Sequence, residues 1–314
     1  MKRFTNENMI DIIEYLTDYL KDKEEKFICE FEVLNPDISL NSYSGEKFNI
    51  DGIEYIYRGF NSWNSLAQTL FCKLMTPTLI SKNFIKLSFM KLNKNDSFHK
   101  STIEQNEKYG TDSIFDNIKK NEEASFINYY LNALKNVDVS SKKRVLNLGI
   151  NSGDEFEVIK QISSNYKNTD FVGIDFCKSA INSAKKNLPE SNFSFLVEDI
   201  NNINNLDLGK FDLIISIGTL QSTTLNFKTF FMSLVQDYLE DKGAIILGFP
   251  NCRWIDTEMI YGAKAPNYSY SELSILFNDV IFCKKYLQQK KYRVTITGRD
   301  YIFLTATSIK KELV

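Results

Sequence analysis

Residues 144–153 contain the pattern with the clearest chemical consequence in this chain. They read RVLNLGINSG, a short apolar run that reaches Asn147 and then turns through Gly149 and Gly153 before a helical pattern begins. A strand that enters a glycine-containing turn and then a helix N-terminus brings free backbone N–H groups toward a ligand. The pattern therefore predicts a site for a nucleotide-like molecule.

Three further polar positions follow apolar, strand-like runs. Asp175 closes the run FVGID, Asp199 follows FLVE, and Ser216 lies near the end of FDLIISIG. The carboxyl ends of parallel strands meet at one edge of a sheet, which is where ligands bind. A carboxylate at Asp175 can accept both hydroxyl groups of a ribose, and one at Asp199 can meet an adenine amino group. Together these positions predict a ligand that contains adenosine.

The elements that must position these residues alternate between strands and helices. Apolar strand-like runs occur at 144–150, 170–175, 193–197, 211–217 and 243–249. Helical patterns lie between them, which predicts a parallel sheet with helices on both faces. Two last strand-like runs flank only Gly298, Arg299 and Asp300, and such a short connection requires antiparallel pairing. The predicted fold class is α/β: a doubly wound, mostly parallel sheet of seven strands with an antiparallel C-terminal strand.

The first hundred residues lack the regular alternation of strands and helices, and we predict that they form a small α+β domain. Its predicted elements are a helix at 9–20, strands at 27–33 and 84–92, a hairpin over 47–57 that turns at Asp51 and Gly52, and a helix from Trp63 to Leu74. A helical pattern at 111–136 begins the next part of the chain. We therefore predict one domain over residues 1–104 and a second, ligand-binding domain over residues 105–314.

Composition excludes several classes of protein. The net charge is −2, so no overall basic field attracts nucleic acid. The five cysteines are scattered and His99 is the single histidine, so we expect no metal site and reduced thiols. The chain shows neither the apolar core of a signal peptide nor a run long enough for a membrane span, and we expect a cytoplasmic protein.

The pattern from about residue 105 to 314 resembles a class I S-adenosylmethionine-dependent methyltransferase. VLNLGINSG corresponds to the first motif of that family, and FVGIDFCKSAINSAKKN to its second strand and helix. FDLIIS and LEDKGAIIL match the fourth and fifth strands. The resemblance implies a Rossmann-like methyltransferase fold and S-adenosylmethionine as the cofactor.

By this resemblance the methionine end of the cofactor lies near the glycine turn and Ser216. Asp175 would hold the ribose, Phe176 would lie near the adenine, and Asp199 with Ile200 would contact the adenine edge. The implied cofactor-binding residues are Asn147, Gly149, Asn151, Gly153, Asp175, Phe176, Asp199, Ile200 and Ser216.

Two positions depart from the family pattern. An acidic residue is common where Asn147 stands, and a glycine where Asn151 stands. Asparagine tolerates a left-handed backbone better than most residues, so the turn can form. By the resemblance, Asn147 lacks the carboxylate that usually helps to hold the cofactor's ammonium group. An NAD site is disfavoured because Asn151 and Asp154 occupy two of the three glycine positions of the dinucleotide fingerprint.

In this family the acceptor site is built by segments after the fourth and fifth strands and by N-terminal additions. The candidate catalytic residues are Gln221, Arg253, Asp256 and His99. The aromatic residues that could line the acceptor site are Phe249, Trp254, Tyr261, Tyr268 and Tyr270. Core packing and a solvated loop would also explain such residues. The favoured acceptor is a small molecule with an aromatic or anionic group.

Other functions remain open from the sequence. The segment from Lys73 to Lys100 is rich in lysines and phenylalanines, so a tRNA or rRNA methyltransferase is one alternative. Cys252 resembles the nucleophile of RNA cytosine methyltransferases, but their proline-cysteine motif is absent. A cofactor-binding protein without transfer activity is the second alternative. The N-terminal domain is expected to help form the acceptor site or a homodimer interface.

Overall fold

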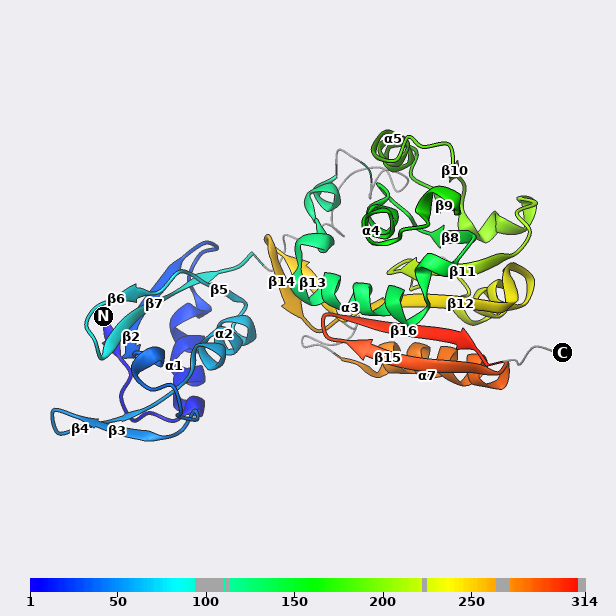
Figure 1. The fold of residues 1–314 in the computed structure, drawn as a ribbon. Helices are drawn as coiled ribbons and strands as arrows, with labels where there is room; N and C mark the ends of the chain where they lie inside the picture. The colour runs from blue at the N-terminus through cyan, green and yellow to red at the C-terminus, as the bar shows by residue number, and fades with distance from the viewer. Residues whose placement is uncertain (94–109, 111–112, 222–224, 264–271, 310–314) are drawn as a thin grey trace. The chain divides into compact units, whose positions relative to one another are not determined.

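The structure is a computed structural model that describes residues 1–93, 110, 113–221, 225–263 and 272–309 (Figure 1). It divides into two compact units: unit 1 is Met1–Ser97 with Trp254–Ile260, and unit 2 is Phe98–Arg253 with Tyr261–Val314. The domain boundary predicted between residues 104 and 105 lies outside the described residues.

Unit 1 contains a small sheet with two helices packed against one face. Its elements are β1 (Lys2–Arg3), α1 (Met9–Lys21), β2 (Ile28–Leu34), β3 (Lys47–Ile50), β4 (Ile53–Ile56), α2 (Phe60–Thr69), β5 (Cys72–Leu74), β6 (Thr78–Leu79) and β7 (Phe84–Lys91). The strand order is β1-β2-β7-β5, and β6 also pairs with β7. Leu16 of α1, Trp63 of α2 and Phe89 of β7 belong to one buried cluster, so the amphipathic helices form the core with the sheet.

Helix α2 ends earlier than its apolar pattern predicted. The helix expected to reach Leu74 stops at Thr69, and Cys72–Leu74 forms β5. Phe71 has a φ of +54°, a left-handed conformation that reverses the chain. Because no glycine marks this position, the end of the helix could not be predicted from local residue types.

Unit 1 also contains most of a hairpin, residues 254–260, from the distant C-terminal half of the chain. Strands β13 (Cys252–Ile255) and β14 (Glu258–Tyr261) form this hairpin. Its residues Ile255 and Ile260 are buried in a cluster with Leu92. The contribution of residues 254–260 to the N-terminal unit was not predicted from the sequence.

Unit 2 has the predicted doubly wound fold. Its elements are α3 (Ala124–Asn136), β8 (Arg144–Leu148), α4 (Asp154–Ile162), β9 (Asp170–Asp175), α5 (Lys178–Asn187), β10 (Phe193–Val197), β11 (Phe211–Ile217), α6 (Phe227–Ser233), β12 (Leu239–Pro250), α7 (Ser274–Gln289), β15 (Tyr292–Gly298) and β16 (Tyr301–Ser308). The seven-stranded sheet has the order β10-β9-β8-β11-β12-β16-β15. Strands β8 to β12 are parallel, and β16 is antiparallel to both neighbours. The fold class is therefore confirmed.

Two buried clusters cover the two faces of this sheet. Phe126 of α3, Phe156 of α4 and Ile181 of α5 belong to one cluster, while Phe231 of α6 and Val280 of α7 belong to the other. The order of strands reverses between β8 and β11, so the topological switch point lies there (Figure 1). Ligands of such sheets bind at the carboxyl ends of the strands at this point.

Helix α3 is shorter than the helical pattern at 111–136 predicted. It begins at Ala124, after the separate 3-10 turn η5 (Lys120–Glu122). Glu123 between them has an extended backbone, with φ −87° and ψ 110°. This break turns Lys120 out of the helix, and its side chain reaches the site described next.

Candidate functional site

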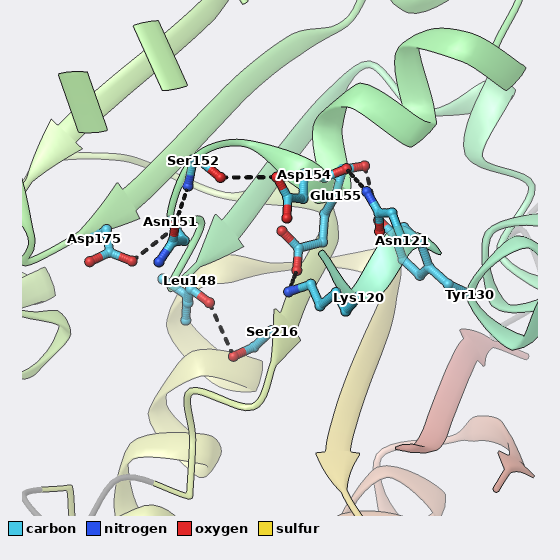
Figure 2. Close-up of polar contacts among 10 residues, drawn as sticks. All are labelled: Lys120, Asn121, Tyr130, Leu148, Asn151, Ser152, Asp154, Glu155, Asp175 and Ser216. Atoms are coloured by element: carbon cyan, nitrogen blue, oxygen red, sulfur yellow. Dashed lines mark hydrogen bonds and ion pairs between the residues drawn. The ribbon is translucent and has the colours of Figure 1, made fainter. Parts of the chain in front are cut away.

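The turn between β8 and α4 has the conformation that its residue pattern predicted. Gly149, Asn151 and Gly153 have φ values of +74°, +48° and +100°. Asn151 thus adopts the left-handed backbone expected of it. Its amide N–H donates to Oδ2 of Asp175 at 3.0 Å, which fixes the turn to the end of β9 (Figure 2).

Asp175 is held in place by the backbone around it. The residue is 6% exposed, and its Oδ1 accepts a hydrogen bond from the amide of Cys177 at 2.9 Å. Burial raises the pKa of Asp175, while the amides of Cys177 and Asn151 stabilise the carboxylate and oppose this rise. Phe176 follows directly and is 41% exposed. A fixed carboxylate beside an exposed aromatic ring suits a ribose with its attached base.

Ser216 lies beside the same turn, on the neighbouring strand. It pairs with Leu148 across β11 and β8, and its hydroxyl donates to the Leu148 carbonyl at 3.3 Å (Figure 2). Gly149 also lies very close to the loop after β11, because a Cβ on this glycine would be 1.9 Å from Oγ1 of Thr219. The carboxyl ends of β8, β9 and β11 therefore converge around one turn.

Asp199 and Ile200 begin the 3-10 helix η8 (Ile200–Asn205), directly after β10. Oδ1 of Asp199 accepts hydrogen bonds from the backbone N–H and from Nδ2 of Asn201, both at 2.9 Å. The carboxylate therefore caps η8, and its second oxygen is the one left for an adenine amino group. The contact of Asp199 and Ile200 with adenine stays a prediction.

Asn147 is buried at the centre of the sheet. It is 1% exposed, and its Nδ2 has no hydrogen-bond partner within the described part of the chain. A buried polar group left unpaired costs about 1–3 kcal/mol. A bound group that accepts a hydrogen bond from Asn147 would remove this cost.

An ion pair that the sequence analysis missed lies near the turn. Nζ of Lys120 donates to Oε1 of Glu155 at 2.5 Å, and the two side chains are only 16% and 2% exposed (Figure 2). Burial alone would lower the pKa of Lys120, but the carboxylates of Glu155 and Asp154 outweigh it and raise that pKa. A lysine before a helix and an acid in a first helical turn are usually exposed, so residue type alone gave no signal of this pair.

Two further contacts fix η5 and the middle of α3 to the first turn of α4. The Tyr130 hydroxyl donates to the Glu155 carbonyl at 3.2 Å, and Nδ2 of Asn121 donates to the Asp154 carbonyl at 3.1 Å (Figure 2). The ion pair is therefore held by groups on both sides. Asp175 and Phe176 suit an adenosyl group, and the Lys120–Glu155 pair suits a charged amino-acid group. S-adenosylmethionine has both groups.

The candidate catalytic residues are found in different parts of the chain. Gln221 follows β11 in unit 2, and its Oε1 is buried without a hydrogen-bond partner among residues that the structure describes. Arg253 is a half-buried residue of β13, and burial lowers the pKa of its guanidinium. His99 lies outside the described residues.

The aromatic residues expected near the acceptor are also dispersed. Phe249 is fully buried in the core of unit 2, so it forms no exposed wall. Trp254 belongs to unit 1, and Tyr261 of unit 2 is 48% exposed. Tyr268 and Tyr270 lie outside the described residues.

Asp256 has structural contacts within unit 1. Its Oδ1 accepts a hydrogen bond from Nζ of Lys26 at 2.7 Å, and its Oδ2 accepts one from the amide of Asn93 at 3.1 Å. Burial opposes ionisation, but the Lys26 ammonium and the Asn93 amide outweigh it and lower the pKa of Asp256. These contacts give the carboxylate a structural role, and the catalytic role of Asp256 stays a prediction.

We expect the substitution Asp256→Asn to lower the free energy of unfolding of unit 1 by about 1–3 kcal/mol, because the hydrogen bonds from Lys26 and Asn93 lose their charged, buried acceptor. Both tryptophans, Trp63 and Trp254, are in unit 1. Urea denaturation followed by tryptophan fluorescence therefore measures the free energy of unfolding of this unit. Since the pKa of Asp256 is lowered by folding, the difference from wild type should be present above the ordinary value of 3.8 and vanish as the pH falls below the folded-state value.

The affinity of the Asp256→Asn variant for S-adenosylhomocysteine is the control measurement. If Asp256 has only a structural role, the variant should be less stable than wild type but bind S-adenosylhomocysteine equally well. Unchanged stability with loss of methyl transfer would instead support the catalytic role first expected of this carboxylate.

Cys252 is not suited to nucleophilic attack. The thiol is buried, and burial together with the carboxylates of Asp300 and Glu123 raises the pKa of Cys252 to about 12. Thiolate is the reactive form, and almost none exists at neutral pH with such a value.

Several lysines of the basic segment are engaged within the chain. Lys73 forms an ion pair with Glu258, and Lys86 forms one with Glu30 at 2.7 Å. Lys91 donates to the Leu20 carbonyl at 2.8 Å, at the end of α1. Intramolecular partners thus reduce the positive charge that this segment offers to phosphates. The remaining lysines beyond residue 93 lie outside the described residues.

The described residues contain neither a candidate metal site nor a helix that could span a membrane. Among them, no three His, Cys, Asp or Glu side chains are grouped so that they could hold a metal ion. No helix in these parts of the chain has the length and apolar composition needed to cross a membrane.

Comparison with known proteins identifies the family. The family model described as "Methyltransferase domain" matches residues 139–295, half of the chain. A search of curated proteins finds no match. The match covers β8 to β12 and includes the turn, Asp175 and Ser216.

Solved structures similar to this chain include several methyltransferases. The plantazolicin methyltransferase BpumL, in complex with a monoazolic desmethylPZN analog and SAH, is 13% identical with a TM-score of 0.42, covering 60% of this chain and 87% of its own. Magnesium protoporphyrin IX methyltransferase from Synechocystis PCC 6803 with bound SAM is 15% identical with a TM-score of 0.37, covering 58% and 80%. Ribosomal protein L11 methylase from Lactobacillus delbrueckii subsp. bulgaricus is 12% identical with a TM-score of 0.39, covering 57% and 76%.

The family match, the sheet order and the geometry of the turn agree with the resemblance found in the sequence. S-adenosylmethionine is the cofactor that the resemblance implies, and the family match agrees with it. The chain belongs to the methyltransferase domain family, with a class I methyltransferase fold in unit 2.

Proposed function

We propose that the chain transfers the methyl group of S-adenosylmethionine to a small-molecule acceptor with an aromatic or anionic group. The observation that carries this proposal is the buried Oε1 of Gln221, which has no hydrogen-bond partner among the described residues. Gln221 follows β11, the strand on which Ser216 lies beside the cofactor turn. An acceptor O–H or N–H group donating to Gln221 would satisfy this oxygen.

The bound cofactor supplies an electrophilic methyl group on a sulfonium, and methyl transfer leaves S-adenosylhomocysteine. Gln221 accepts a hydrogen bond from the acceptor and so orients the acceptor's lone pair for in-line displacement. Arg253 offers a planar guanidinium to a carboxylate or phosphate on the acceptor. The acceptor's proton is released to water after methyl transfer, because the amide oxygen of Gln221 accepts a hydrogen bond but does not keep a proton at neutral pH. The chain's main task is therefore alignment.

The two alternative functions differ in what the described residues support. The partners of Lys73, Lys86 and Lys91 reduce the case for tRNA or rRNA as the acceptor. The second alternative, a cofactor-binding protein without transfer activity, still rests on Asn147, which stands where the family commonly has an acidic residue. We place the proposed activity in the cytoplasm, as expected from the five scattered cysteines of the sequence. A homodimer interface on unit 1 stays a prediction.

We expect the purified chain, incubated with cofactor labelled in the methyl group, to label a compound in the low-molecular-mass fraction of a cell extract. The same extract is divided into small molecules, RNA and protein, and label is counted in each fraction. The variant Gln221→Leu should lose transfer by about 10-fold or more while binding S-adenosylhomocysteine as wild type does. Label in RNA alone would favour the first alternative. Tight binding without transfer to any fraction would favour the second.

A further inference from the structure

We propose that the buried ion pair of Lys120 and Glu155 is the binding subsite for the amino-acid end of the cofactor, with Lys120 and Asn147 facing its α-carboxylate and Glu155 its α-ammonium. The inference rests on the assignment of the cofactor, not on the identity of the acceptor. It explains how the chain functions with an asparagine at the position where an acidic residue is common.

The pair has unused hydrogen-bonding capacity of both signs. A lysine ammonium has three N–H donors, and in the described residues Lys120 uses one of them, on Oε1 of Glu155. The other oxygen of Glu155, Oε2, is buried and has no hydrogen-bond partner among these residues. Buried polar groups in folded proteins are nearly always hydrogen-bonded, so these atoms are expected to bind a partner.

Asn147 is placed to join this subsite. It lies on the same face of β8 as Val145, because side chains two residues apart on a strand share a face. That face carries the buried cluster that includes Tyr130 and Phe156, and these residues flank Glu155 by hydrogen bond and by sequence. The unpaired Nδ2 of Asn147 thus points into the layer that contains the ion pair.

The charges match a zwitterion. An α-carboxylate against Lys120 and an α-ammonium against Glu155 complete a ring of four alternating charges, and the original ion pair need not break. One turn joins this subsite to Asp175, the carboxylate assigned to the ribose, because Asn151 donates to Asp175 and Ser152 donates to Asp154, the residue before Glu155 (Figure 2). The subsite and the ribose position therefore lie around the same turn, as two parts of one molecule require.

This arrangement explains why the side chain at residue 147 is a neutral amide and not a carboxylate. Glu155 already supplies the negative charge, and a second buried carboxylate beside it would cost free energy by like-charge repulsion and desolvation. The amide of Asn147 adds a donor for the carboxylate without adding charge.

The test is isothermal titration of the full chain with four ligands. They are S-adenosylhomocysteine, its analogue without the α-carboxylate, its analogue without the α-amino group, and 5′-methylthioadenosine, which lacks both groups. In the wild-type chain we expect each single deletion to weaken binding by about 10-fold or more. Equal affinities for S-adenosylhomocysteine and 5′-methylthioadenosine would overturn the inference, while no binding of any of the four would contradict the cofactor assignment itself.

The variant Lys120→Met isolates one half of the subsite. We expect it to bind S-adenosylhomocysteine about 10- to 100-fold more weakly, with little change for the analogue that lacks the carboxylate. Glu155→Gln should show the converse, losing discrimination of the amino group. Wild-type affinities for all four ligands in either variant would overturn the inference.

A single substitution leaves one charge buried and can impair folding. The double variant Lys120→Met/Glu155→Leu replaces the pair by apolar side chains, a change that folds are generally able to accept. It should retain affinity for 5′-methylthioadenosine and lose the preference for S-adenosylhomocysteine. The matched control is Lys160→Met/Glu190→Leu, which removes the partly exposed ion pair made by the other end of α4. Equal losses in both double variants would overturn the proposal.

Discussion

The substitution Asp175→Ala should weaken binding of S-adenosylhomocysteine by at least about 100-fold, since hydrogen bonds to a charged group contribute about 1.5–3 kcal/mol each. Two effects act together. The carboxylate that would accept the ribose hydroxyls is lost, and so is the acceptor for the amides of Asn151 and Cys177. The turn after β8 thereby loses its fixed position against β9.

Titration calorimetry measures this loss, and the same strand provides the control. Asp170 begins β9 at the opposite edge of the sheet, where its half-exposed side chain pairs with Arg144 at 3.0 Å. Asp170→Ala removes an equal charge from the same element and should leave the affinity almost unchanged. An Asp175→Ala variant that binds as tightly as wild type would show that the ribose is held elsewhere.

The substitution Gly149→Ala should be the second large effect. Gly149 has a φ of +74°, and a Cβ there would lie 1.9 Å from Oγ1 and 2.8 Å from Cβ of Thr219. The left-handed backbone costs about 1–2 kcal/mol for a residue with a Cβ, and overpacking adds about 1–3 kcal/mol. The loop after β11 must move to relieve the contact, so we expect both lower stability and weaker cofactor binding.

Circular dichroism during urea denaturation and calorimetry with S-adenosylhomocysteine separate the two consequences. Gly52→Ala is the control, because Gly52 has a similar φ of +81° but no atom within 4 Å of the added Cβ. It should show the backbone cost alone and no change in affinity. The close approach would be refuted by a Gly149→Ala variant no less stable than Gly52→Ala.

The sheet of unit 2 was predictable because its information is local. Each buried parallel strand is a short apolar run, and the ends of β8, β9 and β11 coincide with the polar residues singled out in the sequence. Asn151 was correctly expected to accept a left-handed backbone, since that tolerance belongs to the residue type.

What the sequence could not predict depends on contacts between distant segments. The end of α2 is set by Phe71, a residue type that does not favour the left-handed backbone it adopts. The Lys120–Glu155 pair depends on burial by packing between α3 and α4, which no local pattern encodes. The hydrogen bonds from Lys26 and Asn93 to Asp256 join residues that are far apart in the sequence, so the sequence alone could not predict them.

The hairpin at residues 254–260 has a consequence for inheritance. The polypeptide enters unit 1 twice, first as residues 1–97 and again as residues 254–260. A single genetic crossover near residue 97 would transfer a first unit without Ile255 and Ile260, and so without two members of the apolar cluster around Leu92. Transfer of the whole first unit between genes would therefore need both segments, residues 1–97 and residues 254–260.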